Sequence, residues 1–402
     1  MSKVELLSPA GNLEKLKYAV IYGADAVYLG ADKYSLRSSS FSLEDIKKGV
    51  DFAHKHQVKV YAALNIFAKN TDFKDLESYL KKLAKTGIDA LIIADPGVLS
   101  LTLRCCSRIP IHLSTQANVT NGQSALFWAN QGVKRITLAR ELTLEEIAEI
   151  SKTLVQTEVF VHGAMCLSYS GRCYLSNYMT ARDSNSGDCA HPCRWEYSLI
   201  ERKRPKEKFP LEFDSRNTYL LSSKDLCLAK YVPDLIKAGI KSLKIEGRMK
   251  SLHYVATVTS VYRQIIDEYY NNPDKFVFKE QWQEELEKVS HRKYCQGFIV
   301  GNPSQASTAA GMVRGKLSYY KSRDFLATVA SQKNGDMSLE VKNKLEKKEL
   351  LEVLTPNGSN HQFAIDTMTD EKSGLVVECA HANYRVTTKG SWPKYSIIRK
   401  KV

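Results

Sequence analysis

The chain has 402 residues, 43% of them hydrophobic and 25% charged, and a formal net charge of +14. This length and composition are those of a globular protein with room for two domains. No apolar run approaches about 18 residues, and no cationic segment precedes an apolar one at the N-terminus, so we expect neither a membrane span nor a secretory signal. The positive charge favours a polyanionic partner, most simply a nucleic acid, although a lysine-rich solvated surface has the same composition.

A repeated unit organises residues 1–250, in which a glycine ends a helical segment and a short apolar strand follows. Glycine is the usual residue just past a helix C-terminus. The unit begins at Gly23, Gly87, Gly132 and Gly239. Further strands are predicted at Val4–Ser8, Val58–Leu64, Ile111–Ser114 and Thr157–Val161, which brings the number of strands to eight.

Helical patterns separate these strands. Helices are predicted at Asn12–Tyr22, after Ser42, at Asp72–Thr86, at Gly122–Gln131 and after Thr143. Eight alternations of strand and helix predict an α/β fold, a (β/α)8 TIM-like barrel that occupies residues 1–302. The alternative is a doubly wound open sheet, but no G-x-G-x-x-G follows the first strand.

The regular spacing of strands breaks after the seventh, because 85 residues separate Thr157 from Ser242. The extra residues, about 163–225, form a cysteine-rich insertion with a predicted hairpin that pairs 197–200 with 219–222. This insertion falls at the C-terminal face of the barrel, where barrel enzymes carry their catalytic loops.

After the eighth strand, helices are predicted at 252–270 and 279–289, and a small-residue linker follows at 301–310. His291 and Arg292 precede this linker, where we expect a solvated surface, with a phosphate contact as the alternative. Residues 303–402 are predicted to form a small β-barrel domain. Residues 304–402 hold 16 Lys and Arg against 10 Asp and Glu, a charge of +6, so we expect this domain to help hold nucleic acid.

Five cysteines lie within 62 residues of polar loop sequence: Cys166, Cys173, Cys189, Cys193 and Cys227. Nine cysteines in a chain without a visible secretory signal indicate the reducing cytoplasm, where thiols serve as ligands and not as disulfides. Their clustering favours metal ligands over inert buried thiols. The spacing leaves zinc and an iron–sulfur cluster close to even. The favoured ligands are Cys166, Cys173, Cys189 and Cys227, with Cys193 as an alternative ligand.

Five long motifs carry a family resemblance: HGAMCLSYSGRCYLSNYM, GDCAHPCRWEY, SSKDLC, KIEGRMKS and SHRKYCQGF. Together they resemble the collagenase-like peptidase (U32-type) family, and within it the bacterial prephenate-dependent tRNA uridine hydroxylases. The resemblance covers essentially the whole chain. It implies 5-hydroxylation of the wobble uridine of tRNA, a [4Fe–4S] cluster on Cys166, Cys173, Cys189 and Cys227, and prephenate in place of molecular oxygen as the oxygen source.

Two other activities stay open, a collagenase-like peptidase with a structural metal and a hydroxylase of ribosomal RNA. The peptidase has no independent support from the residues, because neither H-E-x-x-H nor G-x-S-x-G occurs and no Cys–His dyad stands out. A non-catalytic RNA-binding protein would not explain the cysteine-rich insertion.

The dicarboxylate co-substrate that the resemblance implies requires cations, and arginine holds a carboxylate through two hydrogen bonds. The candidates are Arg37, Arg182 and Arg248, which lie in loops after barrel strands or in the insertion. Asn65 and Gln116 close two strands and are predicted to bind substrate at the same rim.

Three residues are predicted to be catalytic: His162, Lys244 and Glu246. His162 closes the seventh strand at the same rim. Lys244 and Glu246 lie two residues apart, so their side chains leave the same face of the eighth strand, where a buried ion pair is the structural alternative. Among the many aromatic residues, Trp195 beside the cysteines is the candidate for stacking on an RNA base.

Overall fold

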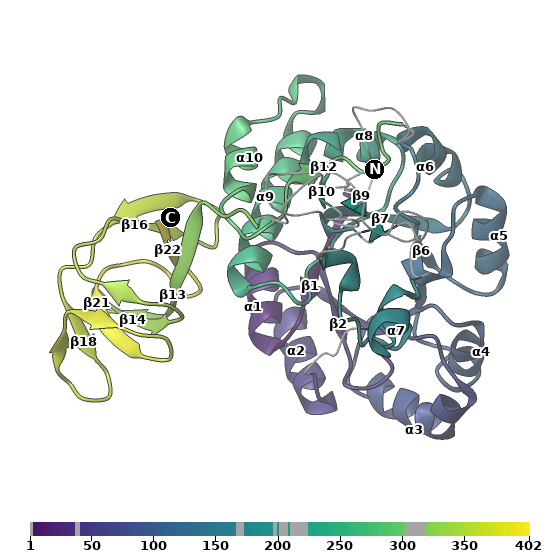
Figure 1. Cartoon of the computed structure of the whole chain (residues 1–402), viewed down its shortest axis with the longest axis horizontal. Coiled ribbons are helices and arrows are strands. Elements are labelled where there is room, and N and C mark those ends of the chain that lie inside the picture. The colour runs from purple at the N-terminus through teal and green to yellow at the C-terminus, as the bar shows by residue number, and fades with distance from the viewer. Residues whose placement is uncertain are drawn as a thin grey trace.

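The computed structural model describes residues 3–36, 41–165, 173–195, 199–200, 208–209, 224–301 and 319–402. These residues form a parallel β-barrel surrounded by helices, and an antiparallel β domain that lies beside it (Figure 1). Within the described part of the chain, no helix is long and apolar enough to cross a membrane.

The barrel consists of eight parallel strands. They are β1 (Glu5–Ala10), β2 (Ala26–Gly30), β3 (Lys59–Leu64), β4 (Ala90–Ile93), β5 (Ile111–Leu113), β6 (Arg135–Thr137), β7 (Gln156–Ala164) and β11 (Ser242–Ile245). Strand β11 pairs with β1 on one side and with β7 on the other, which closes the sheet. The predicted TIM-like barrel is therefore confirmed, and the open doubly wound sheet is excluded.

Helices cover the outside of the barrel. They are α1 (Leu13–Ile21), α2 (Leu43–Lys55), α3 (Phe73–Ala84), α4 (Pro96–Cys105), α5 (Gly122–Asn130), α6 (Leu144–Ile150), α8 (Val232–Lys237), α9 (Leu252–Asn271) and α10 (Glu280–Leu286). The predicted caps are present: the Ser42 hydroxyl accepts from the Asp45 amide at 3.1 Å, and Thr143 and Glu146 form a complete capping box. Helix α4 is absent from the sequence prediction, although Asp95 caps it and Pro96 opens it.

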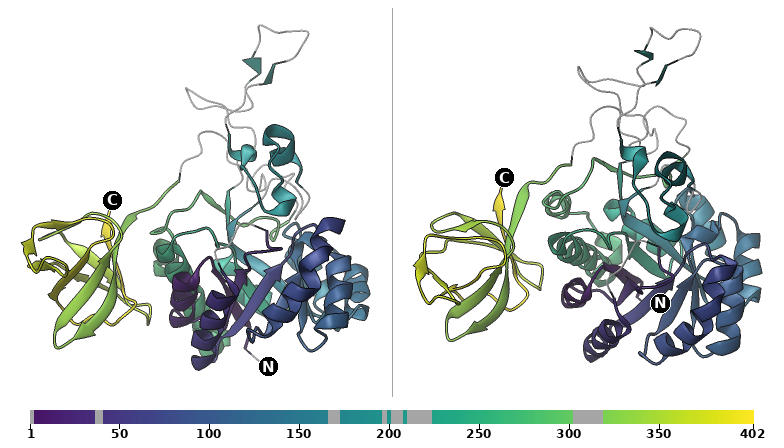
Figure 2. Two further views of the ribbon diagram at one scale, coloured as in Figure 1. Left: turned by 90° about the horizontal axis from the view of Figure 1, so that it is seen from below. Right: turned by 60° about the horizontal axis from the view of Figure 1, so that its bottom comes forward.

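The insertion follows β7, as predicted, and rises from the end of the barrel opposite to the chain's start (Figure 2). Its described elements are α7 (Leu175–Thr180), β8 (Leu199–Ile200), β9 (Lys208–Phe209) and β10 (Asp225–Cys227). Strand β10 runs antiparallel to β7 and pairs on its far side with β12 (Tyr294–Cys295). The predicted hairpin partners 219–222 lie outside the described residues, and among the described residues β8 pairs with β9.

The C-terminal domain is an antiparallel sheet that curls around its own apolar core (Figure 2). Its strands are β13 (Arg323–Lys333), β14 (Asp336–Val341), β15 (Leu345–Glu346), β16 (Leu351–Leu354), β17 (Asn360–Phe363), β18 (Met368–Asp370), β19 (Val376–Val377), β20 (Cys379–Ala380), β21 (Arg385–Lys389) and β22 (Ile397–Lys401). The predicted β character is confirmed. The boundary expected between 302 and 303 falls at the edge of residues 302–318, which are outside the described part.

A buried arginine joins the two domains. The Arg399 side chain on β22 has 0% of its surface exposed and donates to Glu352 of β16 at 2.7 Å and to Glu285 of α10 at 2.5 Å. Tyr22, which ends α1, donates its hydroxyl to the Leu354 carbonyl at 3.0 Å. The β domain is thus held to the outer helices of the barrel by polar contacts shielded from water, which are stronger than the same contacts on a surface.

We predict that Arg399→Leu lowers the free energy of unfolding by about 1.5–3 kcal/mol, because Glu285 and Glu352 lose charge-assisted hydrogen bonds to a buried guanidinium and keep Lys288 as their shared cation. Arg323→Leu is the matched control: Arg323 contacts the same Glu352 at 3.3 Å from a half-buried position, so about 1 kcal/mol or less is expected. Differential scanning calorimetry should show separate barrel and β-domain transitions in Arg399→Leu alone. Identical melting profiles for the two variants would show that Arg399 does not hold the β domain to the barrel.

Candidate active site

A cavity of about 180 Å³ lies at the C-terminal ends of the barrel strands. The barrel contributes Asn65, Gln116, Arg140, Lys244, Glu246 and Arg248 to its wall, and the insertion contributes Cys173, Cys189 and Cys193. We call this space the inner cavity. The structure therefore brings cysteines of the insertion to the same place as the polar residues predicted at the barrel rim.

The five clustered cysteines divide into groups. Cys173, Cys189 and Cys193 line the inner cavity, whereas Cys166 lies outside the described residues. Cys227 lies on β10 opposite His162, below the rim, and burial raises the pKa of its thiol to about 11. Among the described residues, no three His, Cys, Asp or Glu side chains are already arranged as a metal site. The thiols that line the cavity nevertheless have the donor chemistry of an iron–sulfur site.

Lys244 lies at the floor of the inner cavity and is held from below. Its ammonium is 2.8 Å from Glu158 Oε1 on β7 and 4.6 Å from the centre of the Tyr28 ring. Burial lowers the pKa of Lys244, while Glu158 acts in the opposite direction. The buried pair that was the structural alternative for Lys244 exists, with Glu158 in place of Glu246 as the carboxylate.

Glu158 is the centre of an ionic cluster inside the barrel. Burial opposes its ionisation, but Lys244 and Arg135 together bring its pKa down to about 2. Arg135 on β6 lies 3.6 Å from Glu158 and also contacts Glu5 of β1. The cluster places a carboxylate directly against Lys244 beneath the cavity.

Glu246 and Arg248 follow β11 and line the inner cavity with Lys244. Arg248 donates to the Ser35 hydroxyl at 2.9 Å and to the Leu36 carbonyl, so it fixes the loop after β2. That loop continues into Arg37, which is outside the described residues.

Two glycines let the backbone of residues 246–248 pass close to the neighbouring strands. A Cβ on Gly163 would lie 2.6 Å from the Glu246 carbonyl oxygen, and its φ of +107° already excludes most side chains. A Cβ on Gly11 would lie 1.9 Å from the Arg248 carbonyl oxygen. The motif that begins with His162-Gly163 and the motif KIEGRMKS therefore meet at the site.

Asn65 and Gln116, the predicted substrate-binding amides, are brought together at the rim. The Asn65 amide donates to Gln116 Oε1 at 3.1 Å and to Ser114 Oγ at 3.3 Å, and Ser114 also contacts Gln116. The Asn65 carbonyl accepts from the Leu36 amide at 3.2 Å, which links this network to the loop that Arg248 holds.

His162, the third residue predicted to be catalytic, lies on the other side of β7. Its ring packs among Tyr254, Tyr262 and Tyr294, its Nε2 is buried without a partner in the described structure, and burial lowers its pKa to about 3. The cause is an irregularity where β7 pairs with β11: Lys244 is opposite Phe160, but the next residue of β11 is opposite His162. The bulge turns His162 towards the helices.

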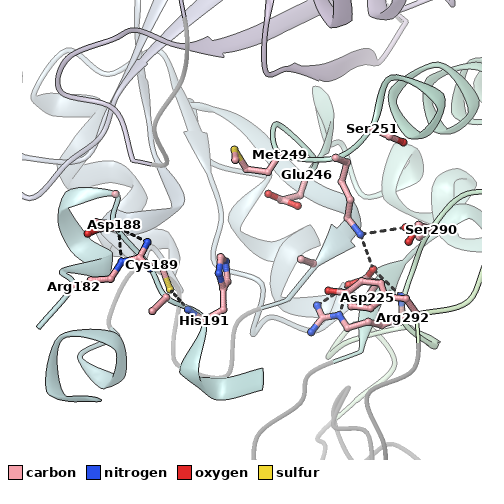
Figure 3. A pocket seen from close by; sticks show the side chains of 15 residues that line it. Arg182, Asp188, Cys189, His191, Asp225, Glu246, Met249, Ser251, Ser290 and Arg292 are labelled. Carbon is pink, nitrogen blue, oxygen red and sulfur yellow. Dashed lines mark hydrogen bonds and ion pairs between the residues drawn. The ribbon is translucent and has the colours of Figure 1, made fainter. Parts of the chain in front are cut away.

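A second, open pocket of about 680 Å³ adjoins the inner cavity, and we call it the outer pocket (Figure 3). Arg182 lies here and donates to Asp188 at 2.8 Å. The opposite wall carries Asp225 and Arg292, which are both 1% exposed and bonded at 2.6 Å (Figure 3). Glu246 lines both spaces.

Sequence reasoning missed part of the site. His291 and Arg292 were expected at a solvated surface, and this is wrong: His291 stacks on Tyr294 at 4.0 Å, and Arg292 is buried against Asp225. Arg140 was not predicted, yet it lines the inner cavity. Arg140 follows the sixth strand just as Asn65 and Gln116 follow theirs, so its position in the sequence could have predicted it.

These observations define the class: a TIM-like barrel whose C-terminal mouth is covered by a cysteine-rich insertion, with a β domain fixed to its side. The model of Peptidase family U32 matches residues 11–309, and the model of the Peptidase family U32 C-terminal domain matches residues 321–399. The chain belongs to peptidase family U32.

Curated relatives resemble the chain over most of its length. It is 42% identical to tRNA hydroxylation protein P1 of Bacillus subtilis (strain 168), over 94% of this chain and 90% of the relative. It is 37% identical to tRNA hydroxylation protein P of Escherichia coli (strain K12), over 92% and 90%. It is 38% identical to the 23S rRNA 5-hydroxycytidine C2501 synthase of the same organism, over 66% of this chain and 39% of that protein.

The buried His112 predicts a loss of stability in acid. Its pKa is lowered to about 3 by burial and by the positive charges of Arg135, Lys244 and Lys59, while Glu158 acts in the opposite direction. Between pH 6.5 and 3 the unfolded chain therefore binds a proton that the folded protein does not. Stability therefore falls as the pH drops through 6.5, by about 2 kcal/mol for this group at pH 5. Glu158, with its lowered pKa, loses its contribution only as the pH falls from about 4.5 towards 2.

His112→Gln removes the titrating group and should reduce the loss of stability between pH 7.5 and 5 by about 2 kcal/mol. Urea unfolding of both proteins at several pH values measures this difference, and any acid effect on bound metal is common to both. Parallel pH profiles for the wild type and the variant would show that His112 is protonated in the folded protein.

Proposed function

We propose that this protein is a tRNA hydroxylase that places a hydroxyl on C5 of the wobble uridine, with prephenate as the oxygen donor and a [4Fe–4S] cluster as the redox centre. The observation that carries the proposal is that relatives named as tRNA hydroxylation proteins match more than nine-tenths of the chain. Thiols and cationic side chains line the same cavity, which supports a redox reaction on an anionic co-substrate.

The proposed cluster ligands are Cys166, Cys173, Cys189 and Cys227, with Cys193 as the alternative. Cys173 and Cys189 reach the inner cavity together with Cys193, which supports a cluster at this place. The donor set consists of soft thiolates, which suit iron–sulfur clusters. When bound, the cluster supplies electron transfer beside the cavity.

The side chains at the rim have distinct roles in the proposed reaction. Arg248 is proposed to hold a co-substrate carboxylate above the Lys244–Glu158 pair, and Arg182 and Arg37 are proposed to extend positive charge towards the mouth. Glu246 lines both spaces, so it is the proposed acceptor of the proton that leaves C5. Asn65 and Gln116, already joined to each other, offer amide groups for orientation.

Exposed aromatic side chains beside the mouth support a nucleic acid substrate. Trp195 has 41% of its surface exposed, and Tyr174 next to Cys173 has 66%. Rings of this kind stack on unpaired bases. Many cations of the β domain have carboxylate partners, for example Lys400 with Glu349 at 2.7 Å, which supports the mouth as the main contact with RNA.

Ribosomal RNA is the second candidate substrate, because one relative is named for 5-hydroxylation of a cytidine in 23S rRNA. That relative is matched over only 39% of its own length, whereas the relatives named for tRNA are matched over 90%. The peptidase alternative rests on the family label.

We predict about four iron atoms and acid-labile sulfide per chain after anaerobic reconstitution. Alanine at Cys166, Cys173, Cys189 or Cys227 should remove the cluster, and Cys193→Ala should retain it. Cys105→Ala and Cys379→Ala are controls, because these residues lie on α4 and β20. If Cys193→Ala loses iron and Cys227→Ala retains it, the fourth ligand is Cys193 and not Cys227. Stoichiometric zinc without acid-labile sulfide would show that the protein holds no iron–sulfur cluster.

We predict that deleting the gene removes 5-hydroxyuridine and its derivatives from tRNA, and that a strain starved of prephenate shows the same loss with or without oxygen. Mass spectrometry of nucleosides from purified tRNA and 23S rRNA is the measurement. An unchanged 5-hydroxyuridine content, in a strain without a second copy of the enzyme, would refute the assignment to tRNA. Loss of a hydroxylated nucleoside from rRNA alone would assign the second candidate.

A further inference from the structure

The floor of the inner cavity alternates cations with aromatic rings. Arg140 Cζ lies 4.0 Å from the centre of the Phe160 ring, and Lys244 Nζ lies 5.3 Å from the same ring. Lys244 Nζ is also 4.6 Å from the Tyr28 ring, and Arg248 Cζ is 5.9 Å from it. Three positive charges are thus spread along one arc by rings that attract them.

The cations of this arc differ in the acceptors that they meet within the wall. Lys244 is neutralised by Glu158 beneath it. Arg140 donates from Nη1 to the Ala164 carbonyl at 2.6 Å, which is a neutral acceptor. Among the described residues that line the inner cavity, Glu246 is the one carboxylate. Arg140 therefore brings to this wall a positive charge whose hydrogen-bond acceptor is neutral, and an anion would suit it.

Arg140 has hydrogen-bonding capacity to spare. Its Nε is buried and has no partner in the described structure. A guanidinium carries five N–H donors, and a buried donor without an acceptor is costly. Arg182 in the outer pocket differs, because its guanidinium already forks onto Asp188 at 2.8 and 2.5 Å. Of these two arginines, Arg140 is the one built to receive an acceptor from outside the chain.

The two spaces differ in size and enclosure. The inner cavity, about 180 Å³, lies between the barrel mouth and residues such as Asn185 and Gly187 of the insertion. The outer pocket, about 680 Å³, is open to solvent and has Met249 and Tyr319 on its wall. A small acid fits the first, and a base attached to a polynucleotide requires the second.

We propose that the inner cavity binds the small carboxylate co-substrate, with Arg140 as the main anchor of a carboxylate beside Arg248, and that the outer pocket receives the nucleobase. The assignment rests on the proposed function for the existence of such a co-substrate. The Phe160 and Tyr28 rings lie against the apolar body of the acid. Glu246 lies on the wall that the two spaces share, so it faces both reactants.

The test is isothermal titration of the anaerobically reconstituted full-length protein with prephenate, and separately with an unmodified tRNA. Arg140→Gln should weaken prephenate binding by about 10- to 100-fold, the loss expected for charge-assisted hydrogen bonds, and leave tRNA binding within about twofold. Arg182→Gln, in which the lost guanidinium is one already paired with Asp188, should leave prephenate binding within about twofold. Arg104→Gln, the same change at an exposed position of α4, is the control for net charge.

Equal prephenate affinity in wild type and Arg140→Gln would overturn the assignment, as would an equal loss of tRNA affinity. Inorganic phosphate that competes with prephenate as strongly as a carboxylic acid would show an unspecific anion site and also overturn it. If Arg140→Gln does not fold, Arg140→Lys keeps the charge but loses the fork, and it should still bind prephenate at least tenfold more weakly.

A measurement on the wild type needs no variant. Phenylglyoxal should modify Arg140 in the free protein, and prephenate should protect it, as read by peptide mass spectrometry. Modification unaffected by prephenate would contradict the assignment. If the wild type hydroxylates tRNA but Arg140 does not affect prephenate binding, this inference alone is wrong. If the wild type does not hydroxylate tRNA, the proposed function is wrong.

Discussion

Glu158 is a carboxylate placed inside a closed barrel, and the structure around it follows from the need to neutralise it. A buried charge without a partner costs several kcal/mol, so cations must reach it. They come from the two strands that flank β7: Arg135 from β6 and Lys244 from β11. Lys244 can do so only because β11 pairs with β7, which is the contact that closes the sheet. The same ammonium then lies at the floor of the inner cavity, so barrel closure and the charge of the site depend on one ion pair.

Much of the architecture is present in local sequence patterns. The glycine-then-strand unit marks the β-strands because glycine past a helix end and an apolar strand after it are both local preferences. The break in spacing after β7 marks the insertion for the same reason. Asn65, Gln116, Lys244, Glu246 and Arg248 could be assigned to one rim, since parallel strands of a barrel present their C-terminal ends on one face.

The remaining features depend on contacts between distant segments. Regular alternation puts His162 on the same face as Phe160, and only the bulge against β11 reverses it. The partner of Lys244 is set by barrel closure, so the sequence spacing pointed to Glu246 when the carboxylate is Glu158. Arg292 was expected at the surface because its partner Asp225 is 67 residues away, beyond any local pattern.

The close approach at Gly11 and Gly163 has a consequence for changing the specificity of this enzyme. A Cβ on either glycine would collide with a carbonyl oxygen of residues 246–248, so the path of this segment requires both glycines. A substitution at 246 would change the wall of both spaces, whereas one at 248 would change the inner cavity alone and release the loop that Arg248 holds. Position 246 is therefore the place where a single substitution reaches both spaces, provided both glycines are kept.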